Sequence, residues 1–203
     1  VTTASRDEII GLDTHLKKLE NLVRGYAKGH STPNIVLVGP GGLGKTLSLA
    51  YIIGATEDVK PLRFFLMQRG LLDIPALAQV NGYKPVGIID DMISEVNPKV
   101  YNMMKQQLEG LQDEIFGRVL VIISGNNEIW KDLPDPVKQR LGGVVLEYKP
   151  NPESNEALLK LFCKKFKVPY KPGYLEAVKS DNLVPRQLRD YVRAIGSELA
   201  GKK

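Results

Sequence analysis

The sequence of 203 residues predicts an α/β fold, in which a five-stranded parallel sheet is followed by a small all-helical domain. Three observations support this prediction. Apolar runs typical of buried strands alternate with segments of helical periodicity as far as Pro150. A glycine-rich loop joins the first apolar run to the next helical segment. Beyond Pro150 only helical patterns follow, so we expect residues 1–150 to form the α/β domain and residues 151–203 the helical domain.

Each predicted strand is short, rich in Val, Ile or Leu, and flanked by turn residues, as in buried parallel sheets. The five strands are expected at residues 34–38, 62–67, 84–90, 118–124 and 143–148. Apolar residues at three- and four-residue steps predict the helices between and after them. These are expected at residues 7–29, 46–54, 74–80, 97–111 and 130–141, where Pro134 and Pro136 should break the last one, and then at 153–167, 173–179 and 185–200.

The composition is that of an ordinary soluble protein, with 43% hydrophobic and 25% charged residues. No apolar run reaches the length of about 18 residues that a membrane span needs, and the N-terminus lacks a signal pattern. We therefore expect no membrane contact and a cytoplasmic protein, or a nuclear or organellar one if eukaryotic. The single Cys163 cannot form an internal disulfide. It is interpreted as an apolar helix residue, with a reactive thiol as the alternative.

The positive charge is concentrated near the C-terminus. Residues 1–150 contain 17 basic and 17 acidic residues, whereas residues 151–203 contain 11 basic and 6 acidic ones, so the excess of +5 lies in the helical domain. Such an excess attracts phosphate backbones. A solvated helical surface accounts for it equally well.

The glycine-rich loop from Gly39 to Thr46 fits the pattern G-x-x-x-x-G-K-[ST] of a phosphate-binding loop. Glycines let backbone N–H groups face the phosphates, and the following helix presents its positive end to the same anion. Lys45 is expected to reach the β- and γ-phosphates, while Thr46 supplies a hydroxyl ligand for Mg²⁺. The sequence therefore predicts an ATP site, with the nucleotide held by Gly39, Pro40, Gly41, Gly42, Leu43, Gly44, Lys45, Thr46 and Leu47.

Two adjacent carboxylates, Asp90 and Asp91, end the apolar run that starts at Val86. Like charges repel, so paired acids at the end of a buried strand indicate a use. We expect Asp90 to hold Mg²⁺ through water and Asp91 to polarise the attacking water. The alternative is a strand end with solvated acids.

These residues together resemble the AAA+ ATPase family, and the resemblance runs from about Glu8 to the end of the chain. The loop matches its Walker A motif, although the family more often has Pro in place of Gly41 and Thr in place of Leu43. The run ending in Asp90 and Asp91 matches its Walker B motif.

The resemblance implies further site residues. Ile9, Ile10 and Gly11 would line the adenine pocket. Asn126 fits the sensor 1 position, with Asn127 as the alternative if the register shifts by one residue. Arg140 resembles an arginine finger, which acts in trans on the nucleotide of a neighbouring subunit, and Arg186 resembles the sensor 2 arginine of the lid. Both arginines have surface helix positions as alternatives.

Most family members have Glu where this chain has Asp91, so its shorter side chain predicts either a compensating site or slow hydrolysis. Bacterial replication initiators resemble this chain in carrying the same pair of aspartates. Unfoldases of the family place an aromatic residue after the second strand, where this chain has Arg69 and Gly70. About five residues follow Leu111 before the fourth strand, which leaves no room for the hairpin that helicases of the family carry there.

The resemblance therefore favours an initiator, helicase loader or clamp-loader-like protein. Such a protein would be an ATPase that assembles into a ring or open ring and acts on DNA or on a DNA-bound protein. Two alternatives stay open: an ATP-dependent remodeller of a protein complex, and a nucleotide-gated assembly factor with slow hydrolysis.

Overall fold

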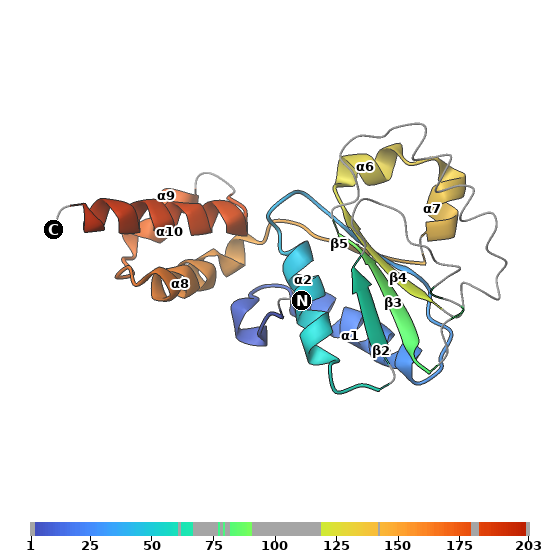
Figure 1. Ribbon diagram of the computed structural model, residues 1–203. Helices are drawn as coiled ribbons and strands as arrows, with labels where there is room; N and C mark the ends of the chain where they lie inside the picture. The colour runs from blue at the N-terminus through green and yellow to red at the C-terminus, as the bar shows by residue number, and fades with distance from the viewer. Residues whose placement is uncertain are drawn as a thin grey trace.

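Five parallel strands form one sheet in the order β2-β3-β4-β1-β5, which confirms the predicted fold class (Figure 1). The computed structural model describes residues 3–60, 62–66, 77, 79, 82–90, 119–141, 143–179 and 183–201. The predicted helices at 74–80 and 97–111 lie largely or wholly outside these residues. The strands are β1 (Ile35–Val38), β2 (Leu62–Leu66), β3 (Lys84–Ile89), β4 (Leu120–Gly125) and β5 (Val144–Glu147).

The centre of the sheet is apolar on both faces. All residues of β1 and β4 are buried, and the same holds for β3 after Lys84. One face carries alternate strand residues into a cluster with two helices, α1 (Asp13–Ala27) and α2 (Lys45–Ala55). These two helices therefore cover one face of the sheet, and the continuous apolar runs in the sequence reflect burial on both sides.

The first helix begins later than the sequence predicts. A short 3-10 helix, η1 (Arg6–Glu8), is capped by the Ser5 side chain, which accepts a hydrogen bond from Asp7 N. Gly11 then adopts a φ of +79°, a left-handed conformation that L-residues disfavour, and α1 starts only at Asp13. The prediction of one helix over residues 7–29 was wrong because Ile9 and Ile10 belong to a connecting segment.

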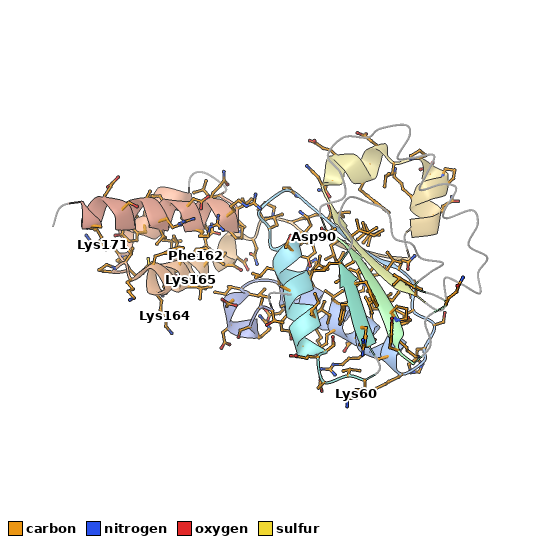
Figure 2. All side chains as sticks on the ribbon, viewed as in Figure 1. Lys60, Asp90, Phe162, Lys164, Lys165 and Lys171 are labelled. Atoms are coloured by element: carbon orange, nitrogen blue, oxygen red, sulfur yellow. The ribbon has the colours of Figure 1, made fainter. Side chains whose placement is uncertain are left out.

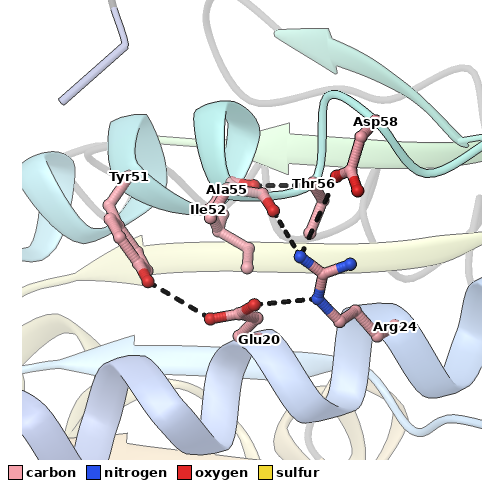
Figure 3. A network of polar contacts seen from close by, with 7 residues as sticks. All are labelled: Glu20, Arg24, Tyr51, Ile52, Ala55, Thr56 and Asp58. Atoms are coloured by element: carbon pink, nitrogen blue, oxygen red, sulfur yellow. Dashed lines mark hydrogen bonds and ion pairs between the residues drawn. The ribbon is translucent and has the colours of Figure 1, made fainter. Parts of the chain in front are cut away.

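Polar side chains join α1 to the end of α2 (Figure 3). The Arg24 guanidinium donates to the Ala55 carbonyl oxygen at 2.6 Å and to Glu20 Oε1 at 2.8 Å. The other Glu20 oxygen accepts a hydrogen bond of 3.2 Å from the Tyr51 hydroxyl. The last carbonyls of a helix have no partner within the helix. Arg24 therefore caps the C-terminus of α2 and fixes it to α1.

Two short helices follow β4, as the sequence predicts in outline. They are α6 (Asn127–Asp132) and α7 (Asp135–Leu141). Pro134 separates them, but Pro136 does not break α7, because it occupies the first turn, where its missing N–H group costs nothing.

The C-terminal segment is helical, with η2 (Pro152–Ser154), α8 (Asn155–Phe166), α9 (Gly173–Lys179) and α10 (Pro185–Ala200). The three α-helices share their own apolar cluster, which includes Leu159, Leu188 and Val192, each at 0% exposure. Cys163 lies in this cluster at 2% exposure, and burial raises the pKa of its thiol. None of the helices in the described ranges is long and apolar enough to cross a membrane.

Candidate nucleotide site

The glycine-rich loop lies between the end of β1 and the start of α2, at the carboxyl edge of the sheet. Gly44 is the N-cap of α2 in a left-handed conformation, with φ of +91°, and as a glycine it provides no side-chain cap. The first N–H groups of a helix lack partners within the helix and attract anions. The loop thus provides backbone donors and a helix N-terminus at one point.

The Lys45 side chain folds back over the loop. Its ammonium group donates to the carbonyl oxygens of Gly39 at 2.6 Å and Pro40 at 2.8 Å. Because Lys45 opens α2, its charge adds to the positive end of the helix. The Lys45 ammonium group therefore lies at the loop, where the predicted contact with phosphate requires it.

Three oxygen-bearing side chains meet beside the loop. Asp90, directly after β3, accepts hydrogen bonds on one oxygen, Oδ1, from Thr46 Oγ1 at 3.1 Å and from Ser124 Oγ at 2.5 Å. Asp90 lies where the strands end, between the sheet and the helical segment (Figure 2). The predicted metal pair, Thr46 and Asp90, is thus brought together. Ser124 was not among the site residues predicted from the sequence.

Tyr148 lies behind the loop, directly after β5. Its N–H group donates to the Val38 carbonyl oxygen at 2.7 Å, and its ring lies 4.7 Å from that of His15, centroid to centroid. A Cβ atom on Gly39 would meet the Tyr148 carbonyl oxygen at 2.6 Å. The tyrosine is fully buried, and this burial raises the pKa of its hydroxyl. Tyr148 therefore packs against the start of the loop at Gly39.

The start of α10 approaches the middle of the loop. A Cβ atom on Gly42 would lie 2.8 Å from the Arg186 Cβ and 3.2 Å from a Val184 methyl group, and the φ of Gly42 is +85°. Only glycine fits such a position without displacing its neighbours. Arg186 is exposed, so the predicted sensor 2 arginine stands beside the loop with its side chain accessible.

The N-terminal segment connects the sheet to the C-terminal helices. Ile9 is buried at 3% exposure, and Ile10 packs against the apolar cluster of the C-terminal helices. A Cβ atom on Gly11 would collide with the Ser154 side chain. The three residues predicted for the adenine pocket therefore lie at the junction between the two parts.

Asn126 follows Gly125, whose carbonyl oxygen accepts a hydrogen bond of 3.3 Å from Gly39 N at the start of the loop. Asn126 is exposed, and its Oδ1 accepts a hydrogen bond of 3.3 Å from Glu128 N at the start of α6. Asn127 is the first residue of α6. Arg140 lies in α7, and its side chain is outside what the structure describes. Asp91 also lies outside the described residues, as do Arg69 and residues 112–117, where the sequence leaves no room for a hairpin.

The residues at the loop fit a nucleotide with Mg²⁺. Mg²⁺ prefers hard oxygen ligands and is usually held by one or two protein groups together with phosphate oxygens and water. The hydroxyl of Thr46 and the carboxylate of Asp90 are 3.1 Å apart and supply such oxygens. Across the described residues, no group of three or more His, Cys, Asp or Glu side chains could hold a metal by itself.

The strand order, the loop and the C-terminal helices define the AAA+ fold. A RuvB mutant from Thermotoga maritima matches with a TM-score of 0.67 and 22% identity, over 98% of this chain and 67% of that chain. The ORC1 protein of Aeropyrum pernix in complex with DNA matches with a TM-score of 0.69 and 15% identity, over 96% of this chain and 62% of that chain. DnaA from Aquifex aeolicus bound to AMPPCP matches with a TM-score of 0.64 and 14% identity, over 92% of this chain and 62% of that chain.

Residues 1–129 match the family model described as "Protein of unknown function (DUF815)", and the chain belongs to that family. No curated protein matches the sequence. The chain spans about half to two thirds of the length of the solved structures that it matches. At these levels of identity the structural likeness establishes the fold alone.

Proposed function

We propose that this chain binds and hydrolyses ATP as an oligomeric switch or motor in DNA replication or another DNA transaction. The observation that carries the proposal is the geometry at the carboxyl edge of the sheet. There, the N-terminus of α2, the Lys45 ammonium group and the Thr46–Asp90 pair lie together. A helix N-terminus and a lysine favour phosphate, and hydroxyl and carboxylate oxygens favour Mg²⁺.

Each residue has a distinct task in this proposal. The backbone N–H groups of residues 39–46 and the Lys45 ammonium group bind the phosphates, and Thr46 and Asp90 hold Mg²⁺. When bound, Mg²⁺ neutralises charge on the phosphate oxygens. Asp91 orients and polarises the attacking water, Asn126 acts beside it, and Arg186 contacts the nucleotide from the C-terminal helices. The adenine base is taken up near Ile9, Ile10 and Gly11.

Oligomerisation is part of the proposal, because Arg140 would complete the site of a neighbouring subunit. We expect the ATPase activity per subunit to rise steeply with protein concentration and to fall in the Arg140→Ala variant. Mixing that variant with Lys45→Ala protein should restore part of the activity, since each supplies what the other lacks. Specific activity that stays flat over a wide concentration range would remove the trans role.

The DNA part of the proposal is supported by charge and by the relatives. The C-terminal segment carries the net positive charge, and within it Lys164 and Lys165 lie on α8 and Lys171 lies between α8 and α9, away from the sheet (Figure 2). Among the similar structures, the ORC1 protein is in complex with DNA and another is described as a DNA replication initiation factor. A basic surface on a nucleotide-dependent switch suits a phosphate backbone.

The test measures ATP hydrolysis with and without single- and double-stranded DNA, and DNA binding at two salt concentrations. We expect DNA to change the rate and the affinity to fall with salt. Replacing Lys164, Lys165 and Lys171 by Gln should lower the salt dependence by up to about one counterion per lysine. Lys60→Gln is the matched control, an exposed lysine on the sheet-containing part of the molecule, and should leave binding unchanged. A DNA affinity that changes neither with salt concentration nor with the three Lys→Gln substitutions would overturn the DNA role.

Single-turnover hydrolysis separates an active ATPase from a slow nucleotide-gated factor. We compare the wild type with Asp91→Glu and Asp91→Asn. A slow wild type that Asp91→Glu accelerates would favour the nucleotide-gated factor. Hydrolysis by Asp91→Asn at the wild-type rate would refute the role given to Asp91.

A further inference from the structure

Ser124 is a fully buried polar residue within an apolar strand. It lies in β4, one residue before its end, and its exposure is 1%. A buried hydroxyl is nearly always hydrogen-bonded, and here it donates to Asp90 Oδ1 at 2.5 Å. This distance is typical of a charge-assisted bond from a hydroxyl to a carboxylate. The strand therefore delivers a strong donor to the carboxylate proposed to hold Mg²⁺.

The register of the sheet explains this contact. β3 and β4 pair in parallel, with Ile89 opposite Ile123, so that Asp90 and Ser124 come next along the two strands. Neighbouring strands lie about 4.8 Å apart, which lets side chains at matching positions meet. Ser124 is thus held by a buried strand, whereas Thr46, the other donor to the same oxygen, is exposed on α2.

Asn126 does not make this contact in the structure. Its amide oxygen accepts from Glu128 N, which caps the start of α6. The polar side chain of β4 that reaches the Asp90 carboxylate is the serine two residues earlier. A donor that touches a metal-holding carboxylate orients it, and the loss of such a donor commonly weakens metal binding about 10–100-fold.

We propose that Ser124 is a positioning residue whose hydroxyl holds the Asp90 carboxylate towards Thr46, so that the oxygen ligands for Mg²⁺ are in place. The proposal rests on the proposed nucleotide site. If Thr46 turns its hydroxyl towards a metal, the Ser124 bond still fixes the rotation of the carboxylate. Ser124 then sets how much Mg²⁺ the site needs, and leaves the metal-free contacts to the phosphates unchanged.

The experiment titrates Mg²⁺ while following the binding of a fluorescent ATP analogue, mant-ATP, without relying on hydrolysis. In Ser124→Ala we expect the Mg²⁺ concentration at half-maximal effect to rise about tenfold. Affinity for mant-ATP in EDTA should stay within about twofold of the wild type. Ser124→Thr keeps the hydroxyl and should restore the midpoint. If Ser124→Ala does not fold, Ser124→Cys, a weaker donor, should raise the midpoint in the same direction.

Thr56→Val is the matched control. It also removes a buried hydroxyl, one that donates to the Ile52 carbonyl oxygen at 2.6 Å, but at the opposite end of α2. It should leave the Mg²⁺ midpoint unchanged. In an Asp90→Asn background, Ser124→Ala should add no further shift, because the carboxylate that it orients is gone.

The outcomes separate the two proposals. If the wild type fails to bind mant-ATP, the proposed function fails and the role of Ser124 fails with it. If the wild type binds with a clear Mg²⁺ dependence and Ser124→Ala matches it within twofold, the positioning role alone is overturned. Equal shifts in Ser124→Ala and Thr56→Val would also overturn that role, because the effect would then be a general loss of stability.

Discussion

The two edges of the sheet differ in how they use their polar groups. At the carboxyl edge, α2 begins after Gly44, which provides no side-chain cap, and Lys45, Thr46 and Asp90 gather beside it. At the amino edge, polar groups are tied to one another. The Tyr26 hydroxyl donates to the Pro85 carbonyl oxygen at 2.9 Å, and the Asn34 side chain accepts from Val121 N at 3.1 Å.

This difference suggests that the carboxyl edge of the sheet serves ligand binding and the amino edge serves stability. Arg24 caps the C-terminus of α2, so the helix is fixed at the end far from the loop and left open at the end that would meet a ligand. Changes at the carboxyl edge should therefore alter nucleotide binding, whereas changes at the amino edge should alter stability alone. Each of the following experiments tests one side of this contrast.

The largest effect is expected at Lys45. Lys45→Ala removes the charged donor of the loop, and a charged hydrogen bond contributes about 1.5–3 kcal/mol. We expect affinity for ATP to fall about 10–100-fold, measured by calorimetry, with little change in thermal stability. Lys60→Ala, a change at an exposed lysine away from the loop, serves as the control. An unchanged affinity in Lys45→Ala would remove the nucleotide site from this edge.

The second prediction compares adjacent glycines of the loop. A Cβ atom on Gly42 would collide with Arg186 and require a left-handed residue, which costs about 1–2 kcal/mol for L-residues, whereas one on Gly41 would meet nothing within 4 Å. Gly42→Ala should lower affinity for ATP about tenfold and displace the start of α10. Gly41→Ala should stay within about twofold. Equal effects of the two substitutions would contradict the close approach of α10 to the loop.

The third prediction concerns the anchored end of α2. Arg24→Ala leaves the Ala55 carbonyl oxygen and Glu20 without this partner, and we expect a loss of about 1–2 kcal/mol in the free energy of unfolding. Affinity for ATP should stay within about twofold. Lys18→Ala, an exposed change on the same helix, should cost less than about 0.5 kcal/mol. A large loss of affinity in folded Arg24→Ala protein would show that the two edges are not independent.

The smallest effect appears at alkaline pH. Burial raises the pKa of Tyr26 to about 12 from its ordinary value of 10. Below pH 10 both states keep the proton, but between pH 10 and 12 the unfolded state loses it first, so stability falls as the pH rises through this window. Tyr26→Phe should reduce this slope in urea titrations and cost about 1 kcal/mol at neutral pH. An unaltered slope would contradict the burial of the neutral hydroxyl.

Much of the fold could be predicted from the sequence, because strands buried on both faces, such as Ile35–Val38, form continuous apolar runs that are easily recognised. The Thr46–Asp90 pair followed from motif spacing. Ser124 could not be found in this way, since a single serine in an apolar run has no spacing signal and its role depends on register with β3. The break at Gly11 was missed because helical periodicity continues through the connecting segment.

The segment around Gly11 limits how the C-terminal helices can move. Ile10 packs into their apolar cluster, while Leu12, two residues later, packs against the cluster beneath the sheet. The Lys165 ammonium group adds a contact of 3.7 Å to the Glu8 carboxylate. If the C-terminal helices rotate away from the sheet, either Ile10 leaves their apolar cluster or the segment leading to α1 moves with them. Exposing Ile10 in such a rotation would cost at most about 1.5–3 kcal/mol, the value for a fully buried isoleucine.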